Sequence, residues 1–151
     1  MDILVDNQQE LAKIGARLGS AAKGGEVVEL IGDVGAGKTT LTKAIALGMG
    51  ISDDVGSPSY VLSQTYDAPS GLRLRHYDFY RLSDPGILAA ELEEALQDEH
   101  AVIVIEWGDI VAGILPNDHL QIRIVPTSDI ARRLSFTSGG ESSKRLVERL
   151  K

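Results

Sequence analysis

The sequence contains no cysteine. This absence excludes a disulfide framework and a thiolate metal site, and it agrees with a reducing compartment. No segment approaches the roughly 18 uninterrupted apolar residues of a membrane-spanning helix. The first six residues also lack the basic start and the apolar run of a secretory signal. We therefore expect a cytoplasmic protein that makes no use of a membrane.

Positive charge is scarce as well. The chain carries 15 Lys and Arg against 22 Asp and Glu, a formal net charge of −7. Such a surface repels nucleic-acid phosphates, so any role in RNA chemistry is expected to run through a partner. Because 151 residues suit one compact core, we expect a single domain over residues 1–151. This length leaves little room for a separate substrate or lid domain.

One motif stands out from this background. Residues 32–39 read Gly-Asp-Val-Gly-Ala-Gly-Lys-Thr and match G-x-x-x-x-G-K-[ST] in full. A β-branched, apolar stretch precedes the motif at residues 26–31, and apolar residues at helical spacing follow it up to residue 47. This strand and helix context argues against an accidental glycine-rich turn. It indicates a P-loop that binds a nucleoside triphosphate with Mg²⁺.

The residue types of the motif explain its chemistry. Glycine permits positive φ and lets main-chain N–H groups approach phosphate oxygens. The helix that begins near Lys38 directs its positive dipole end at the same anion. Lys38 is expected to reach the β- and γ-phosphates, and the Thr39 hydroxyl is expected to bind Mg²⁺. The predicted nucleotide-binding residues are Asp33, Val34, Gly35, Ala36, Gly37, Lys38, Thr39 and Thr40.

Two carboxylates could complete the site. Residues 101–105 form a continuous apolar run, typical of a strand buried on both faces, and Glu106 follows it. Residues 61–66 and 72–78 predict a hairpin whose second strand ends in Asp78. P-loop proteins usually find a second Mg²⁺ ligand at the carboxyl end of a neighbouring strand. Either residue could instead only cap a turn, so both readings stay open.

The remaining pattern alternates helices and strands. It predicts a helix capped by Asn7, a helix with Pro85 at its first position, strands at 120–125 and 133–137, and a terminal helix at 142–151. Together these elements predict an α/β, P-loop NTPase-type, three-layer fold. Its sheet should be mixed and largely parallel, with an inserted β-hairpin.

Several further residues remain ambiguous. His76 alternates with leucines, so a half-buried, hydrogen-bonded histidine is a better reading than a catalytic one. Trp107 either walls the site or fills the core. Arg132 and Arg133 either contact phosphate or carry surface charge on an exposed edge strand. The chain has no Asn-Lys-x-Asp element for guanine, which favours ATP. No arginine-rich lid is evident, although Arg73, Arg75 and Arg81 keep a phosphotransferase possible.

Four blocks of sequence taken together resemble the TsaE family, formerly YjeE. They are the P-loop at 32–40, Ser-Pro-Ser-Tyr at 57–60, His-Tyr-Asp-Phe-Tyr-Arg-Leu at 76–82 and Val-Ile-Glu-Trp at 104–107. The P-loop is generic, whereas the last two blocks are specific. The resemblance covers nearly the whole chain. It implies a bacterial ATPase needed for N6-threonylcarbamoyladenosine at position 37 of tRNA, acting with the TsaB and TsaD proteins.

The resemblance also implies roles for individual residues. Lys38 and Thr39 would bind nucleotide and Mg²⁺, Glu106 would be the second Mg²⁺ ligand, and Asp78 would be a catalytic or switch carboxylate. Residues 57–60 correspond to a switch-like loop, with Ser59 where threonine is common. The helix after Pro85 lacks the family's usual Glu-Leu-Gly run, which leaves the partner surface open. We hypothesise that partner binding orders the loop and accelerates hydrolysis.

Two other kinds of protein could use the same loop. One is a small-molecule phosphotransferase, and the other is a nucleotide-dependent binding module that does not hydrolyse ATP.

Overall fold

The computed structural model describes residues 1–53, 55, 63–80 and 82–151. The predicted switch-like loop at 57–60, the first two residues of the predicted hairpin and Arg81 lie outside these ranges. The strands are β1 (Asp2–Val5), β2 (Val27–Ile31), β3 (Ser63–Asp67), β4 (Arg73–Asp78), β5 (Ala101–Glu106), β6 (Leu120–Pro126) and β7 (Arg132–Ser138). The helices are α1 (Gln8–Ala21), α2 (Lys38–Gly48), α3 (Ile87–Ala95), the 3₁₀ helix η1 (Gly108–Ile114) and α4 (Glu141–Glu148).

The described strands form one seven-stranded sheet in the order β1-β7-β6-β2-β5-β4-β3. The central strands β6, β2, β5 and β4 run parallel to one another, and β7 and β3 run against them. The hairpin of β3 and β4 closes one side of the sheet, and β1 adds to the other. The predicted α/β three-layer fold, with its mixed, largely parallel sheet and inserted hairpin, is confirmed.

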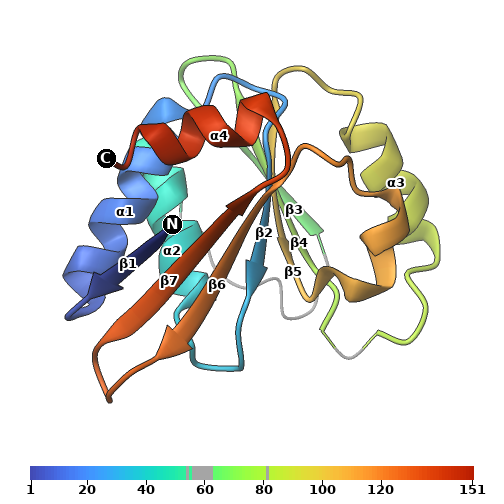
Figure 1. The fold of residues 1–151 in the computed structure, drawn as a ribbon. Coiled ribbons are helices and arrows are strands. Elements are labelled where there is room, and N and C mark those ends of the chain that lie inside the picture. Colours follow the sequence, from blue (N-terminus) through green and yellow to red (C-terminus); the bar gives the residue numbers. More distant parts are fainter. Residues whose placement is uncertain (54, 56–62, 81) are drawn as a thin grey trace.

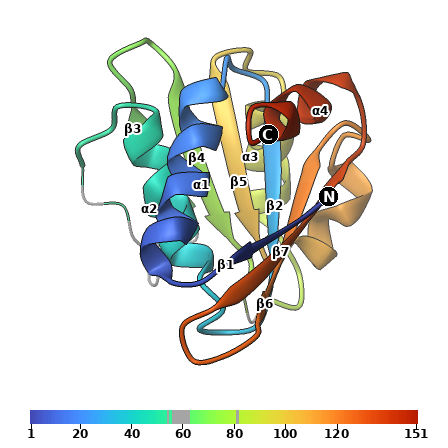
Figure 2. The ribbon, with the colours of Figure 1, turned by 60° about the vertical axis from the view of Figure 1, so that its left-hand side comes forward.

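Helices cover both faces of the sheet. Helices α1, α2 and α4 lie on one face, and α3 and η1 lie on the other (Figures 1 and 2). Strand β5 separates the two layers, since Val102 and Val104 join the core beneath α1 and α2 while Ile103 and Ile105 join the core beneath α3. All six residues of β5 are buried, as its apolar run predicts. No helix in the described ranges is long and apolar enough to cross a bilayer.

Close packing of α1 against α2 positions the P-loop helix. A Cβ on Gly19 would lie 2.0 Å from the carbonyl oxygen of Ile45, and one on Gly48 would lie 2.1 Å from that of Ala16. Only glycine fits where two helix backbones approach this closely. The amino end of α1 forms as predicted, because the Asn7 side chain accepts the N–H of Glu10 at 2.9 Å.

Two predicted helix boundaries are wrong, and one strand does not have the edge position that the sequence left open. Helix α3 begins at Ile87 rather than at Pro85, because Gly86 has a φ of +53° and its N–H is held by the Asp84 side chain. Ile87 consequently points to solvent and is 87% exposed. Helix α4 ends at Glu148, short of the predicted end. Strand β7 is not at an edge, because the unpredicted strand β1 pairs with it.

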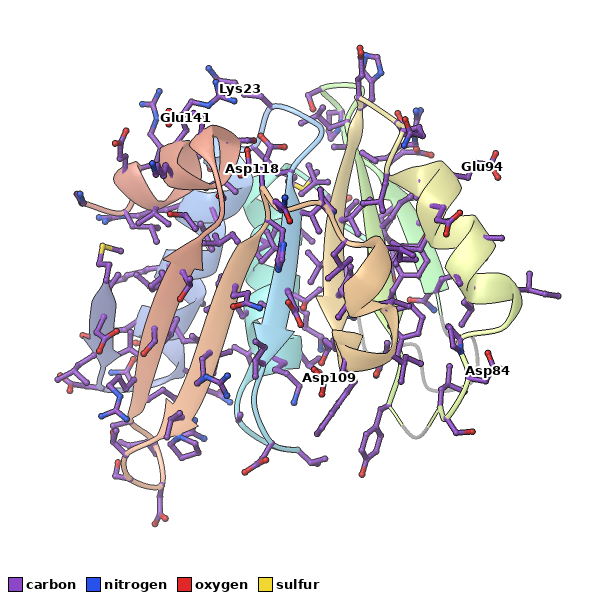
Figure 3. The ribbon with its side chains drawn as sticks, turned by 45° about the vertical axis from the view of Figure 1, so that its right-hand side comes forward. Lys23, Asp84, Glu94, Asp109, Asp118 and Glu141 are labelled. Carbon is purple, nitrogen blue, oxygen red and sulfur yellow. The ribbon has the colours of Figure 1, made fainter. Side chains whose placement is uncertain are left out.

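Asp118 holds the start of α4 from the loop before β6 (Figure 3). Its carboxylate accepts the N–H groups of Ser142 and Ser143 at 2.8 and 3.0 Å and the Ser143 hydroxyl at 2.6 Å. Burial raises the pKa of Asp118, but the bonds from Ser143 and Ser142 outweigh it and hold the pKa below its usual range.

We predict that Asp118→Ala lowers the free energy of unfolding by about 1 to 2 kcal/mol at neutral pH, the usual effect of losing a helix cap. Because the folded pKa is lowered, this stabilisation is present above the unfolded pKa of about 4 and is lost as the pH falls through the folded value. Urea titrations at pH 7 and pH 3 measure both effects. Glu94→Ala, on the exposed side of α3 (Figure 3), is the control, and an equal loss in both variants would contradict the prediction.

Candidate nucleotide-binding site

The P-loop connects β2 to α2 with the backbone that its glycines predict. Gly35 and Gly37 have φ values of +82° and +116°. The N–H of Ala36 donates to the carbonyl of Asp33 at 3.0 Å, which turns the chain back toward α2. Of the predicted nucleotide-binding residues, Lys38 and Ala36 are buried, Asp33, Val34 and Gly35 are exposed, and Gly37, Thr39 and Thr40 are intermediate. The tip of the loop is therefore open to solvent, and its base is packed into the protein.

Lys38 lies at the base of the loop and is only 6% exposed. Its Nζ donates to the carbonyl oxygens of Gly32 at 2.5 Å and of Asp33 at 2.9 Å. The same nitrogen lies 4.7 Å from the centre of the Trp107 ring, a cation–π distance. The ammonium group is thus held between P-loop carbonyls and an aromatic face.

Trp107 lies beside Lys38 and also packs, partly buried, against the core beneath α3. It follows β5 directly and has a φ of +57°, the one positive value among the described non-glycine residues. Its ring packs against that of Tyr80, with centroids 4.8 Å apart. Tyr80 and Trp107 come from the two specific sequence blocks, so tertiary packing brings these blocks together over Lys38. Strained backbone of this kind clusters at functional sites, where the surrounding structure holds it.

Asp78 and Glu106 end neighbouring parallel strands side by side. They are paired in register, and the Phe79 N–H donates to the Glu106 carbonyl at 3.0 Å. Alternation along β5 puts Glu106 on the face of Val104, and alternation along β4 puts Asp78 on the face of Leu74. Both belong to the face that α2 covers. The structure therefore brings the two predicted carboxylates together on the side of the sheet from which the P-loop helix begins.

Glu106 is oriented by a residue that the sequence does not reveal as functional. His76 is completely buried, and its Nε2 lies 2.6 Å from Oε2 of Glu106. A carboxylate can only accept, so Nε2 carries the proton. Nδ1 of His76 is buried without a hydrogen-bond partner among the described residues. The sequence predicts a half-buried histidine, but His76 is completely buried. The signal for its role was its position, because His76 stands two residues before Asp78 and therefore on the same face of the strand.

Asp78 has an electrostatic environment unlike that of a surface carboxylate. Burial raises its pKa above the usual range, and the nearby Glu106 carboxylate raises it further. A hydrogen bond from the Tyr80 N–H at 2.9 Å opposes this rise, as do His76 and Lys38. Asp78 therefore caps a turn by accepting the Tyr80 N–H, which is one of the two roles that the sequence allowed. It also interacts electrostatically with Glu106 and Lys38. A raised pKa makes its carboxylate a better proton acceptor.

The donor set suits a hard divalent cation. Thr39 offers a hydroxyl and Glu106 a carboxylate, both of which are oxygen ligands that Mg²⁺ accepts. Within the described ranges no group of three His, Cys, Asp or Glu residues could hold a metal by itself. Mg²⁺ in P-loop sites needs few protein ligands, because phosphate oxygens and water complete its shell. The residues present therefore fit this ion.

A cavity adjoins the P-loop, and Glu29 lines it from the face of the sheet opposite α2. It has a volume of about 140 Å³. It is lined in part by Glu29, Asp33, Trp107, Asp109 and Arg123. The buried Glu29 carboxylate is held by His119 at 3.2 Å and by Gln121 at 3.1 Å. Asp109 lies at the same edge of the sheet as the P-loop (Figure 3).

Comparison of the sequence with known proteins identifies the family of this chain. The sequence profile of the family described as "Threonylcarbamoyl adenosine biosynthesis protein TsaE" matches residues 5–134. The chain belongs to the TsaE family. The curated TsaE protein of Bacillus subtilis is 36% identical over 148 residues, covering 95% of this chain and 89% of its own length. That of Streptomyces coelicolor is 35% identical, covering 87% and 92%.

A solved structure supports the family assignment. The crystal structure of YdiB from Bacillus subtilis superposes with a TM-score of 0.81 at 32% sequence identity, covering 99% of this chain and 93% of that one. The sequence blocks that carried the resemblance to TsaE all fall within residues 32–107, inside the matched region.

Proposed function

We propose that this protein is a Mg²⁺-dependent ATPase that supports formation of N6-threonylcarbamoyladenosine at position 37 of tRNA. The observation that carries the proposal is the convergence of Lys38, Asp78 and Glu106 beside the P-loop in a chain of the TsaE family. The curated relatives are named as tRNA threonylcarbamoyladenosine biosynthesis proteins. A cytoplasmic location belongs to the same proposal, since tRNA and ATP are both found there.

Each residue has a defined task in cleavage of the γ-phosphate. The P-loop amides and the Lys38 ammonium neutralise phosphate charge and fix the position of the nucleotide. Asp78 accepts a hydrogen bond from the attacking water and orients it toward the phosphorus. Water adds to the γ-phosphorus as the bond to the β–γ bridging oxygen breaks, giving ADP and inorganic phosphate. Trp107 and Tyr80 restrict bulk water at the Lys38 side of the site.

Mg²⁺ would be held by Thr39 and Glu106. When bound, the ion neutralises charge on the phosphate oxygens. His76 keeps the Glu106 carboxylate turned to the α2 side, in the way that hydrogen-bonded partners orient the ligands of metals generally.

We further propose that TsaB and TsaD are the partners, with tRNA contacted only indirectly. The net charge of −7 supports an indirect role on RNA. The sequence has no evident arginine finger, so the isolated chain should hydrolyse ATP slowly.

The partner proposal predicts that adding TsaB and TsaD raises the steady-state ATPase rate of this chain by about tenfold or more, since completing a phosphoryl-transfer site typically has effects of this size or larger. Phosphate release measured with and without the partners tests it. Equal rates would remove the coupling while leaving the ATPase itself intact.

The same assay separates the alternatives. A small-molecule phosphotransferase would transfer labelled phosphate to an acceptor instead of releasing it. A binding module without hydrolysis would show no turnover that depends on Asp78. A reconstituted tRNA modification assay with and without this chain then links turnover to the modification.

A further inference from the structure

Arg132 lies at the start of β7, 96 residues from Ala36 of the P-loop, yet its guanidinium contacts this loop. Nε donates to the carbonyl oxygen of Ala36 at 2.9 Å, and Nη2 makes a longer contact of 3.5 Å with that of Gly35. Nη1 donates to carbonyl oxygens in the turn between β6 and β7, at 2.8 Å in the case of Ala131. One side chain therefore ties this turn to the tip of the P-loop.

The tip has few other contacts to hold it. Val34 is 72% exposed, and a Cβ placed on Gly35 would meet no described atom within 4 Å. Gly35 has no Cβ, which gives this segment unusual conformational freedom and permits the positive φ found there. A guanidinium, with its rigid fork of donors, can bridge carbonyl oxygens from two different loops, which a single ammonium group does less well.

We propose that Arg132 is a positioning residue that holds the tip of the P-loop in its phosphate-binding form and polarises the peptide group between Ala36 and Gly37. The C=O and N–H of a trans peptide point in opposite directions. A positive group on the Ala36 carbonyl therefore strengthens the Gly37 N–H as a donor on the other side, where phosphate binds. The proposal rests on nucleotide binding by the P-loop, but it gives Arg132 no direct contact with phosphate.

The chain provides a matched control at the next position. Arg133 carries the same charge on the same strand, but it is exposed and points from the opposite face of the sheet. Its backbone pairs with β1 and β6, but its side chain makes no hydrogen bond or ion pair with the described residues. Arg132→Gln and Arg133→Gln therefore remove equal charge at neighbouring positions, and only the first removes the contacts to the P-loop.

Two measurements on the full chain test the role of Arg132. In calorimetric titration with Mg²⁺ and ATP, Arg132→Gln should raise the Kd about tenfold and Arg133→Gln less than about twofold. In the protein without nucleotide, hydrogen exchange at the Ala36 amide, which donates to Asp33, should accelerate in Arg132→Gln alone. The melting temperature should be similar in both variants, because neither residue belongs to the buried core.

The outcomes separate this role from the proposed function. Equal weakening of ATP binding by both substitutions would mean that charge alone matters, and it would overturn the positioning role. Unchanged exchange at Ala36 in Arg132→Gln would overturn it as well, whether or not ATP binds. If the unmodified chain binds no ATP, the proposed function fails, while the exchange measurement still decides whether Arg132 holds the loop.

Discussion

Replacing Lys38 with alanine is expected to weaken ATP binding by about a hundredfold or more and to remove measurable turnover. The ammonium is nearly buried between P-loop carbonyls and the Trp107 ring, so its charge acts at short range with little solvent screening. Losing a charge-assisted hydrogen bond to phosphate in such a place costs about 3 kcal/mol, which corresponds to this factor in the Kd. Calorimetric titration of ATP measures the binding, and phosphate release measures the turnover.

Lys43→Ala is the matched control for this substitution. Lys43 lies on the same helix five positions later, and it is exposed. Its removal changes net charge by the same amount without touching the P-loop, so binding should stay within about twofold, as is usual for surface changes. Similar losses in both variants would contradict the role of Lys38. In the tRNA modification assay, Lys38→Ala should behave like omission of the protein.

The parts of the site that sequence predicts are those set by local chemistry. The P-loop motif determines its own backbone, because glycines at fixed offsets permit the positive φ values found at Gly35 and Gly37. The apolar run of β5 reports burial on both faces, and it therefore also locates Glu106 at the carboxyl end of a central strand. Neither inference needs knowledge of distant contacts.

The remaining parts depend on contacts between residues far apart in the chain. His76 meets Glu106 across 30 positions, and Arg132 meets Ala36 across 96. The spacing of polar and apolar residues within one element cannot predict such pairs, because they depend on which strands become neighbours in the sheet. Once β4 is known to lie beside β5 in parallel register, however, the shared face of His76, Asp78 and Glu106 follows from alternation alone.

The errors at the ends of elements have two origins, one of them long-range and one local. Strand β1 has four residues, too few for an alternating pattern to be distinguished, and only pairing with β7 defines it. The sequence does not predict β1, so an exposed edge position for β7, with a surface role for Arg132, stays open as one alternative until the β1–β7 pairing is known. At α3, Asp84 and Pro85 form a favourable helix start, but the positive φ of Gly86 delays the helix. Tertiary pairing decided the first case, and the local backbone at Gly86 decided the second.

The carboxylate of Glu106 should be needed for the Mg²⁺-dependent part of ATP binding. Glu106→Gln keeps the size of the side chain and an oxygen that can accept from Nε2 of His76, so the fold should persist. It removes the charge that binds the metal. We expect ATP affinity without Mg²⁺ to change less than about threefold, affinity with Mg²⁺ to fall about tenfold, and turnover to fall about a hundredfold, since the metal also neutralises charge in the transition state.

Asp109→Asn provides the control for Glu106→Gln. Asp109 lies three residues further along the chain at the same edge of the sheet, and its side chain is exposed (Figure 3). Titrations with ATP at zero and saturating Mg²⁺ separate the two contributions, because only a ligand of the metal changes the difference between them. If Glu106→Gln weakened binding equally under both conditions, Glu106 would act on the nucleotide or on the fold rather than on the ion. If Asp109→Asn reproduced the effect, general negative charge at this edge would account for it, and Glu106 would lose its specific role.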